Sequence, residues 1–394
     1  MEERKNRFVY DVPTKIYFGE GQIEQLAGII GEYGSRVLLV YGGGSIKRSG
    51  IYDKVMELLQ NEKIDVWELS GVEPNPRLAT VCRGVEICRE HDIEVVLPIG
   101  GGSTIDCAKG VAAGFYHQGS PWDLVEDSSL IQQALPIVAV LTLAATGSEM
   151  DGDAVISNPD TCDKMEMNSK LLYPRASILD PAYTYSVPSY QTACGTADIM
   201  SHVMEIYLAG KGGNEVQDRF MEGLLSTCVK YGPIACREPE NYEARANLMW
   251  ASSWAINGFI SCGVSSCWPL HAMEHQLSAY YDVTHGHGLA VLIPVWMEYV
   301  LNHKTVERFA LYGTKVFGIP DTKDSYEIAR LAIQKTREVF VEMGLSLTMK
   351  DLGIATDEFY EDMAIKAAEG LEDSVIPLGK EDVIRIYQKA EKGL

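Results

Sequence analysis

The hydrophobic residues of this chain follow one spacing in its first half and another in its second. In the first half, short apolar runs such as 36–41 (RVLLVY) alternate with amphipathic stretches such as 51–63 (IYDKVMELLQNEK). Alternating strands and helices of this kind build a mostly parallel sheet covered by helices. From about Val187 onward, apolar residues recur every three or four positions, as in helices. We therefore predict an α/β domain over residues 1–187 and an all-helical domain over residues 188–394.

The composition is that of an ordinary globular protein. With 394 residues the chain is too long for one compact core, and 46% of its residues are hydrophobic and 23% charged. A formal net charge of −21 argues against nucleic acids and anionic membranes as partners, because both are polyanions. No apolar run is long enough to span a bilayer, and the N-terminus lacks the apolar core of a signal peptide. We expect a cytoplasmic protein with no nucleic-acid or membrane partner.

The nine cysteines are scattered singly along the chain. Their number is odd and no C-x-x-C motif occurs, so reduced thiols are expected and not a disulfide framework. Zinc binding by Cys262 and Cys267 is an alternative to their expected role as small side chains of a helical segment.

Three polar loops follow apolar strands in the first half and predict a nucleotide site. Two are glycine turns that expose backbone N–H groups at a helix start, where the helix dipole favours an anion. These turns are Gly42, Gly43, Gly44 and Ser45, and Gly100, Gly101, Gly102 and Ser103. The third loop carries Thr142, Thr146 and Ser148. Open α/β sheets bind ligands in the crevice that such loops form. Neither turn matches G-x-G-x-x-G, and the alternatives are simple chain reversal and a capped helix start.

The residues around the first glycine turn favour NADP(H) over NAD(H). NAD-selective sites often hold the ribose 2′-hydroxyl with an Asp or Glu, and that carboxylate would repel a 2′-phosphate. Here the strand ends at Tyr41, and Lys47 and Arg48 follow the turn. Ser45 is able to bond a phosphate, and the two basic residues favour it.

A group of histidines in the second half has the spacing of metal ligands. Asp198 and His202 stand four residues apart, as do His271 and His275, and His285 follows. A four-residue step on a helix places two side chains on one face, about one turn apart. One carboxylate and three imidazoles suit Fe²⁺ or Zn²⁺, although each histidine alone would be an ordinary hydrogen-bonded or surface residue. The pattern predicts a site for one divalent metal.

Several motifs occur in order along the chain: YGGGSIKRSG, GGGSTIDCAK, TLAATGSE, the Asp198/His202 pair and HAMEHQLSAYYDVTHGHGLA. Together they resemble the iron-containing (group III) alcohol dehydrogenases, and in particular the butanol-dehydrogenase-like aldehyde-reductase branch. The resemblance runs from about residue 8 to about residue 300. It implies a Rossmann-like, dehydroquinate synthase-like domain with a parallel sheet, an all-α domain, a metal in the cleft between them, and a homodimer.

The resemblance also implies roles for individual residues. The metal ligands would be Asp198, His202, His271 and His285. His275 would relay a proton near the nicotinamide. The cofactor would contact the second glycine turn and a dispersed set of further residues, namely Asp106, Asn75, Thr142, Leu143, Thr146, Ser148, Lys164 and Tyr183. Asp151 and Asp153 stand where relatives often carry Asn. Their negative charges beside the cofactor loop are expected to weaken NADP(H) binding or to change its pH dependence.

The expected activity is the interconversion of a small aldehyde, such as butanal, and its primary alcohol. The metal would polarise the carbonyl and the nicotinamide would supply the hydride. An alternative is an NAD-using lyase or cyclase of the same fold. HAMEH also fits the H-x-x-E-H pattern of zinc peptidases with Glu274 as base, and a non-catalytic metal-storage protein is a third class. Aromatic residues near the ligands suggest either an apolar substrate site or helical core packing, namely Trp250, Trp254, Phe259, Trp268 and Tyr280.

Overall fold

The computed structural model describes residues 7–393, and the chain separates into two compact units. The α/β unit contains Asp11–Val187 and Pro239–Ser253. The helical unit contains the described residues up to Tyr10, then Pro188–Glu238 and the chain from Trp254 onward. Neither unit is therefore one continuous stretch of sequence.

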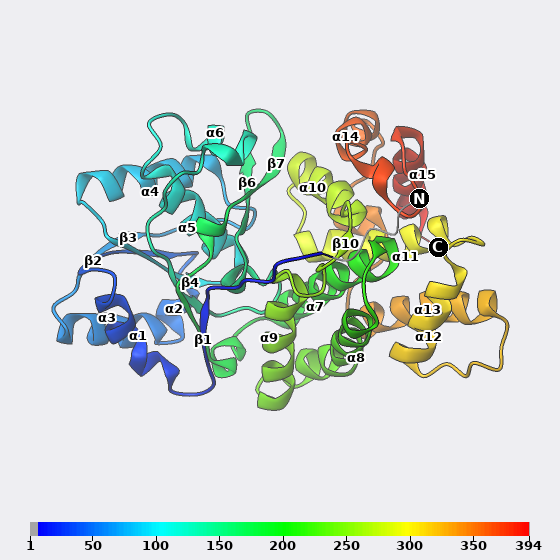
Figure 1. Ribbon diagram of the computed structural model, residues 1–394, viewed down its shortest axis with the longest axis horizontal. Coiled ribbons are helices and arrows are strands. Elements are labelled where there is room, and N and C mark those ends of the chain that lie inside the picture. Colours follow the sequence, from blue (N-terminus) through cyan, green and yellow to red (C-terminus); the bar gives the residue numbers. More distant parts are fainter. Residues whose placement is uncertain (1–6, 394) are drawn as a thin grey trace. The chain divides into compact units, whose positions relative to one another are not determined.

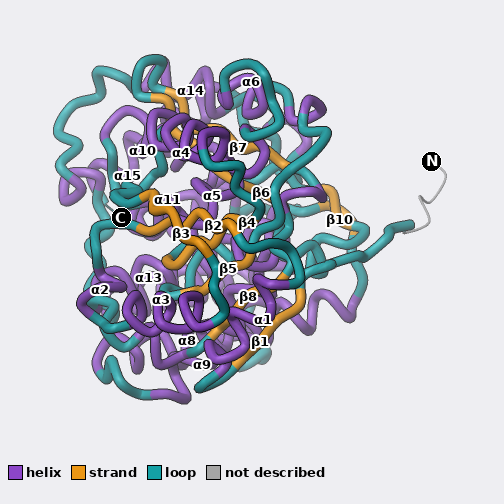
Figure 2. The backbone as a smooth tube through the Cα atoms, turned by 90° about the vertical axis from the view of Figure 1, so that its left-hand side faces the viewer, coloured by secondary structure: helices purple, strands orange, loops and turns teal. Residues whose placement is uncertain are grey.

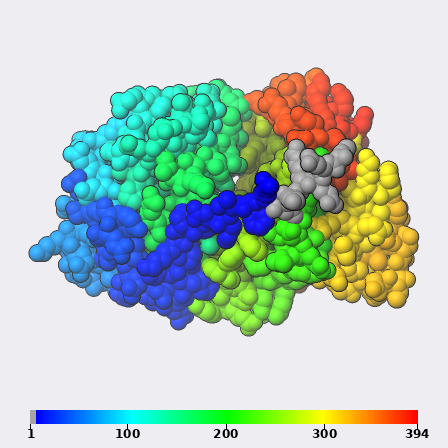
Figure 3. Space-filling model, in the orientation of Figure 1, coloured from blue at the N-terminus to red at the C-terminus, as the bar shows by residue number. Residues whose placement is uncertain are grey.

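The α/β unit is built on a six-stranded parallel sheet with the strand order β1-β8-β5-β4-β2-β3. Its strands are β1 (Lys15–Phe18), β2 (Arg36–Tyr41), β3 (Asp65–Leu69), β4 (Val95–Gly100), β5 (Val138–Leu141) and β8 (Ala176–Leu179). The central strands are apolar throughout because both faces of a parallel sheet are covered by helices. Within the described residues β1 pairs only with β8, so its other edge is open. The dark-blue N-terminal segment that contains β1 lies on the surface in Figure 3.

Helices cover both faces of this sheet. Figures 1 and 2 show α4 and α5 on one face and α1 and α3 on the other. The helices of the unit are α1 (Leu26–Gly31), α2 (Ser45–Arg48), α3 (Ile51–Asn61), α4 (Leu78–Glu90), α5 (Gly102–Gly114), α6 (Pro121–Glu126) and most of α9 (Tyr242–Ile256). Short 3₁₀ helices lie at Gln22–Gln25, Ser128–Leu130, Ser148–Met150, Lys170–Leu172 and Pro181–Thr184.

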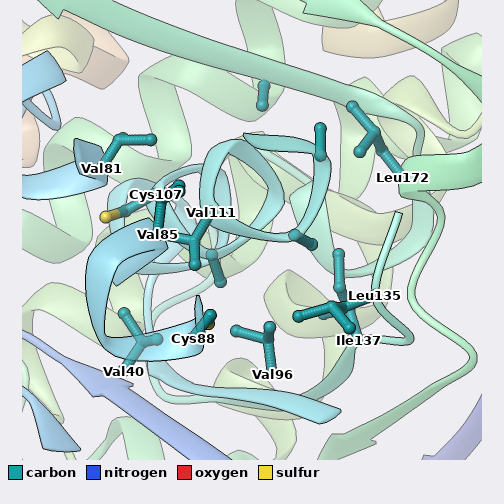
Figure 4. Packing of buried hydrophobic residues seen from close by; sticks show 14 of the residues in the cluster. Val40, Val81, Val85, Cys88, Val96, Cys107, Val111, Leu135, Ile137 and Leu172 are labelled. Atoms are coloured by element: carbon teal, nitrogen blue, oxygen red, sulfur yellow. The ribbon is translucent and has the colours of Figure 1, made fainter. Parts of the chain in front are cut away.

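The two faces of the sheet have separate cores because successive side chains of a strand point to opposite faces. Leu38 and Val40 of β2 pack under α4 and α5, whereas Val37, Leu39 and Tyr41 pack toward α1 and α3. Figure 4 shows the first core, with side chains contributed by β2, β4, α4, α5 and the segment before β5. Burying each such Val or Leu contributes roughly 1.5–3 kcal/mol relative to exposure.

The α/β unit also contains a hairpin that the hydrophobic pattern did not predict. Its antiparallel strands are β6 (Asp153–Asn158) and β7 (Asp163–Asn168), and β6 contacts α5. The sequence of β7, DKMEMN, lacks an apolar run, so nothing in the local pattern indicates a strand.

The helical unit is dominated by α-helices, as predicted. They are α7 (Ser189–Met204), α8 (Glu215–Arg237), α10 (Pro269–Tyr281), α11 (His285–Val300), α12 (Val306–Phe317), α13 (Ser325–Glu342), α14 (Tyr360–Ala367) and α15 (Lys380–Lys392). A π-helical turn, Glu205–Ala209, continues α7, and two 3₁₀ helices lie at Met349–Leu352 and Leu371–Asp373. The departure from an all-α unit is a small antiparallel ribbon of β9 (Lys211–Gly212) and β10 (Val264–Ser265).

Helix α11 is the central element of the helical unit. It is apolar on nearly all sides, is buried from Gly286 to Met297, and contacts α7, α10, α13 and α15. A helix that is hydrophobic all round belongs in the middle of a bundle. Its first residue, His285, is thereby fixed beside α7 and α10.

The predicted fold class, a parallel α/β domain plus a helical domain, is confirmed. Across residues 7–393, no helix has both the length and the apolarity needed to cross a bilayer. All nine cysteines lie in this range, and none of them forms a disulfide bond there.

Candidate metal centre and nucleotide loops

Four predicted ligands come together inside the helical unit. Asp198 and His202 lie one turn apart on α7, and their exposed fractions are only 2% and 3%. His271 comes from the first turn of α10, and His285 is the first residue of α11. Three helices therefore carry the four side chains that the family resemblance implied as ligands.

The three imidazoles converge on one oxygen of the Asp198 carboxylate. The Oδ1 atom of Asp198 lies 3.6 Å from Nε2 of His202, 3.7 Å from Nε2 of His271 and 3.5 Å from Nε2 of His285. The His202 and His271 rings are stacked, with centroids 4.7 Å apart. Ligand atoms bound tetrahedrally at about 2.0–2.1 Å stand about 3.3 Å from one another, and the three distances from Asp198 are close to that value. Ligand atoms of Asp198, His202 and His271 all lie within 4.8 Å of one another, and a second such group consists of Glu274, His275 and His285.

The hydrogen bonding also fits a bound ion. Asp198 Oδ1 and His271 Nε2 are buried and have no hydrogen-bond partner among the described residues. Buried polar atoms are nearly always paired, and an orphan calls for an explanation. An oxygen and three imidazole nitrogens are a suitable donor set for Fe²⁺ or Zn²⁺.

The ionisable groups of this cluster have strongly shifted pKa values. Burial by itself would raise the pKa of Asp198, but the neighbouring His202, His271 and His285 hold it well below its usual value. Burial lowers the pKa of His202 to about 3. Burial acts in the same direction on His271, but the charges of Glu205 and Asp198 outweigh it and raise its pKa to about 10. Because an imidazole ligand must give up its proton, a metal competes with protons for this cluster.

Two buried glutamates hold the outer nitrogens of the cluster, and sequence reasoning assigned neither of them this place. Glu205 contacts Nδ1 of His271, and Glu274 contacts Nδ1 of His285. Both glutamate side chains are 0% exposed. Glu274 also accepts a hydrogen bond from Ser278 Oγ at 2.6 Å. A carboxylate engaged in this way is badly placed to serve as the general base of a peptidase, so the H-x-x-E-H reading is not favoured.

His275 lies next to the cluster. It is half-buried, and its ring centroid lies 5.9 Å from that of His271 and 5.5 Å from that of His285. Trp268 lies edge-on to the rings of His202 and His271, with centroids 6.0 and 5.6 Å away. The role of His275 as a proton relay stays a prediction.

In the α/β unit, the second glycine turn has the geometry of an anion site. Gly101 precedes α5, a helix of 13 residues, and Thr146 packs directly against the turn. A Cβ atom on Gly102 would lie 2.2 Å from Thr146 Oγ1, and one on Gly101 would lie 3.1 Å from Leu143 Cβ. The glycines are therefore required by the close approach of the loop after β5. The first turn is a weaker candidate for an anion site, because the helix that follows it, α2, is only four residues long. Gly44 before this helix has a φ of 89°.

Two of the predicted cofactor residues are bonded to each other. Ser148 Oγ donates to Asp106 Oδ1 at 2.6 Å, and the N–H of Val155 donates to Asp106 Oδ2 at 3.1 Å. These bonds fasten α5 to the loop after β5 and to the β6–β7 hairpin. A direct contact of Asp106 or Ser148 with a cofactor stays a prediction.

The two unusual aspartates are part of a closed ionic network. Lys109 of α5 is 0% exposed, and its Nζ donates to Asp151 Oδ1 at 2.6 Å and to the Asp151 and Asp153 carbonyls at 3.0 and 2.7 Å. Asn168 Nδ2 donates to the Asp153 carboxylate. Burial raises the pKa of Asp151 well above its usual value, against the opposing charge of Lys109. Sequence reasoning missed Lys109, which stands three residues after Asp106.

Three other predicted cofactor residues lie on separate elements. Asn75 follows β3 with a left-handed backbone, φ 54°, and is 8% exposed. Lys164 lies on β7 and is 6% exposed. Tyr183, in the 3₁₀ helix after β8, packs against the core on the α1 and α3 face, and burial raises its pKa to about 12. Their contact with a cofactor stays a prediction.

The basic residue of the first turn has an acidic partner. Lys47 Nζ lies 3.5 Å from Glu68 Oε2 and 4.4 Å from the centroid of the Tyr52 ring. The hydroxyls of Tyr41 and Tyr52 donate to the same carboxylate at 2.5 and 2.7 Å. A carboxylate on the strand next to β2 was not expected from the sequence.

Comparison with known proteins gives consistent results for both units. Residues 13–181 match the model of the family described as iron-containing alcohol dehydrogenase, and residues 192–391 match that of the Fe-containing alcohol dehydrogenase family, C-terminal. NADH-dependent butanol dehydrogenase A of Clostridium acetobutylicum is 53% identical over 97% of this chain and 99% of its own length. NADPH-dependent aldehyde reductase YqhD of Escherichia coli is 38% identical over 89% of this chain and 90% of its own.

A solved structure agrees with these matches. NADH-dependent butanol dehydrogenase A from Thermotoga maritima superposes with a TM-score of 0.91 and 37% identity, covering 98% of this chain and 99% of that one. The predicted family and the predicted class of activity, an oxidoreductase acting on alcohol and aldehyde groups, are confirmed. The chain belongs to the iron-containing alcohol dehydrogenase family.

Proposed function

We propose that this protein interconverts a small aldehyde, such as butanal, and its primary alcohol, with one divalent metal and a nicotinamide cofactor. The observation that carries the proposal is the convergence of three imidazole Nε2 atoms on Asp198 Oδ1, at 3.5–3.7 Å, with buried orphan atoms at the centre. The names of the Clostridium and Escherichia relatives support the substrate class.

The residues divide the work between the two units. Asp198, His202, His271 and His285 would hold the metal, which when bound would act as a Lewis acid on the carbonyl oxygen. The turn before α5 and the start of that helix would bind the cofactor's pyrophosphate with backbone N–H groups. The nicotinamide would carry the hydride. His275 would pass a proton to the oxygen that becomes the alcohol hydroxyl.

The decisive experiment removes the metal and one ligand. Protein stripped by a chelator should lose butanal-dependent NADH oxidation and should regain it with Fe²⁺ under anaerobic conditions or with Zn²⁺. His271→Ala should stay inactive after reloading, while NADH binding, measured by fluorescence, stays near the wild-type value. Wild-type rates in stripped His271→Ala would overturn the metal mechanism. Metal analysis of anaerobically purified protein would identify the resident ion.

For the cofactor we propose NAD(H), in place of the NADP(H) preference expected from the sequence. Glu68 forms an ion pair with Lys47 beside the first glycine turn. Its negative charge would repel the 2′-phosphate of NADP(H) there. Two relatives of 53% and 52% identity are named as NADH-dependent. The test is the ratio of kcat/KM for NADH and NADPH. Glu68→Gln should move that ratio toward NADPH about tenfold, about 1.4 kcal/mol. A higher kcat/KM with NADPH in the wild type would restore the original expectation.

We also propose a homodimer that works in the cytoplasm. The open edge of β1 and the exposed Phe18 at the end of this strand offer a surface for a second copy, and cysteines that form no disulfide bond suit a reducing compartment. Sedimentation equilibrium tests the dimer, and a monomer at micromolar concentration would exclude it.

A further inference from the structure

We infer that Glu205 and Glu274 are positioning residues of the metal centre, which fix the proton of two imidazoles and join the three helices that carry the ligands. The inference rests on the proposed metal site. It concerns two glutamates behind the ligands: the spacing and the motifs gave Glu205 no role, and they gave Glu274 only that of a peptidase base.

Glu205 connects the end of α7 to the start of α10. It is the first residue of the π-helical turn that follows α7, three residues after His202. Its Oε1 atom accepts hydrogen bonds from the N–H groups of Leu270 and His271, the latter at 3.1 Å. These are first-turn N–H groups of α10, whose preceding residue Trp268 provides no side-chain cap. Glu205 therefore supplies from another element the cap that this helix start lacks.

The second oxygen of Glu205 determines which nitrogen of His271 faces the metal site. Oε2 contacts Nδ1 of His271. An ionised carboxylate only accepts hydrogen bonds, so the proton of the ring stays on Nδ1. The lone pair of Nε2 is then directed at the cluster, where this atom lies 3.7 Å from Asp198 Oδ1. Carboxylate partners of this kind orient ligand histidines and increase their basicity.

Glu274 repeats the arrangement one helix further on. It lies on α10, three residues after His271, and contacts Nδ1 of His285 on α11. Gly288 of α11 makes room for it, because a Cβ atom there would lie 2.9 Å from Glu274 Oε1. Glu205 thus ties α7 to α10, and Glu274 ties α10 to α11. His202 needs no such link, since it shares α7 with Asp198, and its buried Nδ1 has no hydrogen-bond partner among the described residues.

The two glutamates differ in how well an amide would replace them. Both oxygens of Glu205 face N–H donors, so the NH₂ group of a glutamine would oppose either the helix start or His271 Nδ1. At Glu274 one partner is the Ser278 hydroxyl, which also lies 3.3 Å from the Val283 carbonyl. A hydroxyl accepts as well as donates, so a glutamine there keeps its carbonyl for His285. Glu205→Gln should therefore be more damaging than Glu274→Gln.

The test measures metal affinity and ligand geometry in the full-length protein without turnover. Metal-free wild type, Glu205→Gln and Glu274→Gln are titrated with Co²⁺ against a chelator, and the visible d–d bands are recorded. Glu205→Gln should bind Co²⁺ about 10–100-fold more weakly, with altered bands, and Glu274→Gln less than about tenfold more weakly. Glu222→Gln is the matched control. It is also a buried glutamate of the helical unit, but it accepts from Tyr207 and Arg219, and should stay within about twofold of wild type.

The outcomes separate this inference from the proposed function. Absence of Co²⁺ binding by wild type would overturn the metal site itself. Tight binding by wild type and unchanged binding and bands in folded Glu205→Gln would overturn the positioning role alone. If Glu205→Gln does not fold, Glu274→Ala is measured in its place. Its control is Ser278→Ala, which removes the hydrogen bond from Ser278 but keeps the contact of Glu274 with His285. Glu274→Ala should lose about tenfold or more in Co²⁺ affinity, and wild-type affinity there would overturn the inference.

Discussion

Each unit of this protein buries a cluster of charged and polar side chains, and the two clusters are built in opposite ways. In the α/β unit, Lys109 meets Asp151 at 2.6 Å and Asp106 meets Ser148 at 2.6 Å. In the helical unit, three imidazole nitrogens surround Asp198 Oδ1 at 3.5–3.7 Å, and orphan atoms remain. The polar atoms of the first cluster find their partners within the chain, whereas in the second Asp198 Oδ1 and His271 Nε2 have no hydrogen-bond partner among the described residues.

The difference teaches how to interpret buried charge in a sequence of this kind. A buried ion pair whose remaining positions are all hydrogen-bonded fixes the packing of elements and calls for no ligand. Buried nitrogen and oxygen atoms that face one common point and include atoms without a hydrogen-bond partner indicate a binding site. The same residue types therefore have different meanings in the two units, and experiments on each cluster should give different kinds of result.

Removing the Asp198 carboxylate from the helical unit's cluster should have the largest effect, a loss of activity. Asp198→Asn removes the charge on which the imidazoles converge, and Lewis-acid stabilisation worth several kcal/mol is lost, a fall in kcat of about 10³-fold or more. The measurement is butanal-dependent NADH oxidation together with the metal content of the purified variant. Circular dichroism serves as the folding control. A variant with full metal content and normal rates would contradict the assignment of Asp198.

Removing Lys109 from the cluster of the α/β unit should lower the free energy of unfolding and leave the metal content unchanged. Lys109→Met leaves Asp151 as a buried carboxylate without its partner, which costs roughly 3–5 kcal/mol. Urea unfolding followed by circular dichroism measures this loss, and bound metal per chain should stay at the wild-type value. The double variant Lys109→Met/Asp151→Asn should recover part of the stability. Loss of metal from a folded Lys109→Met protein would contradict the expectation that the Lys109 cluster affects stability and not metal binding.

Metal should stabilise the protein only through the open cluster. An ion at one hundred times its dissociation constant stabilises the native state by about 2.7 kcal/mol. Thermal unfolding of stripped wild type should therefore shift upward on addition of Zn²⁺, whereas Asp198→Asn should show no shift. A similar shift in both proteins would place the binding elsewhere.

A half-buried surface carboxylate, Glu94, should give the smallest effect of the four changes. Hydrogen bonds from the N–H groups of Ser35 and Arg36, with the charge of Arg36, hold the pKa of Glu94 below its usual value. A lowered pKa stabilises the fold above the usual range, and this contribution disappears as the pH falls through the folded-state pKa. Glu94→Gln should cost less than about 1 kcal/mol at pH 7, because solvent screens the site. Unfolding curves of both proteins between pH 7 and pH 3 should converge at the acid end, and a constant difference would contradict this cause.

The hydrophobic pattern predicted those helices and strands that are buried either on one face or on both faces. The apolar run of β2 and the amphipathic helix α3 were recognisable because their surroundings dictate their residue types. The hairpin of β6 and β7 was not, because β7 lacks an apolar run and the contacts between β6 and α5 join segments that are distant in the sequence.

The convergence of the candidate metal ligands was predictable for a similar reason. Asp198 with His202, and His271 with His275, show the helical step directly in the sequence. Glu205 contacts a residue 66 positions away, and only the packed helices bring the two together. Lys109 escaped notice because a fully buried lysine is rare, and a lysine in a helix is normally expected at the surface.

Helix α9 has a consequence for the order in which the protein forms during synthesis. Residues Pro239–Ser253 belong to the α/β unit although 51 residues of the helical unit, Pro188–Glu238, come before them. Met249 fills a core cluster with Ile105 and Leu141, and Ser253 Oγ bonds to the buried Glu149. A nascent chain that has emerged only as far as Val187 still lacks this layer. The α/β unit therefore reaches its native core only after the ribosome has made α7, the helix that carries Asp198 and His202, so the two units do not mature one after the other along the chain.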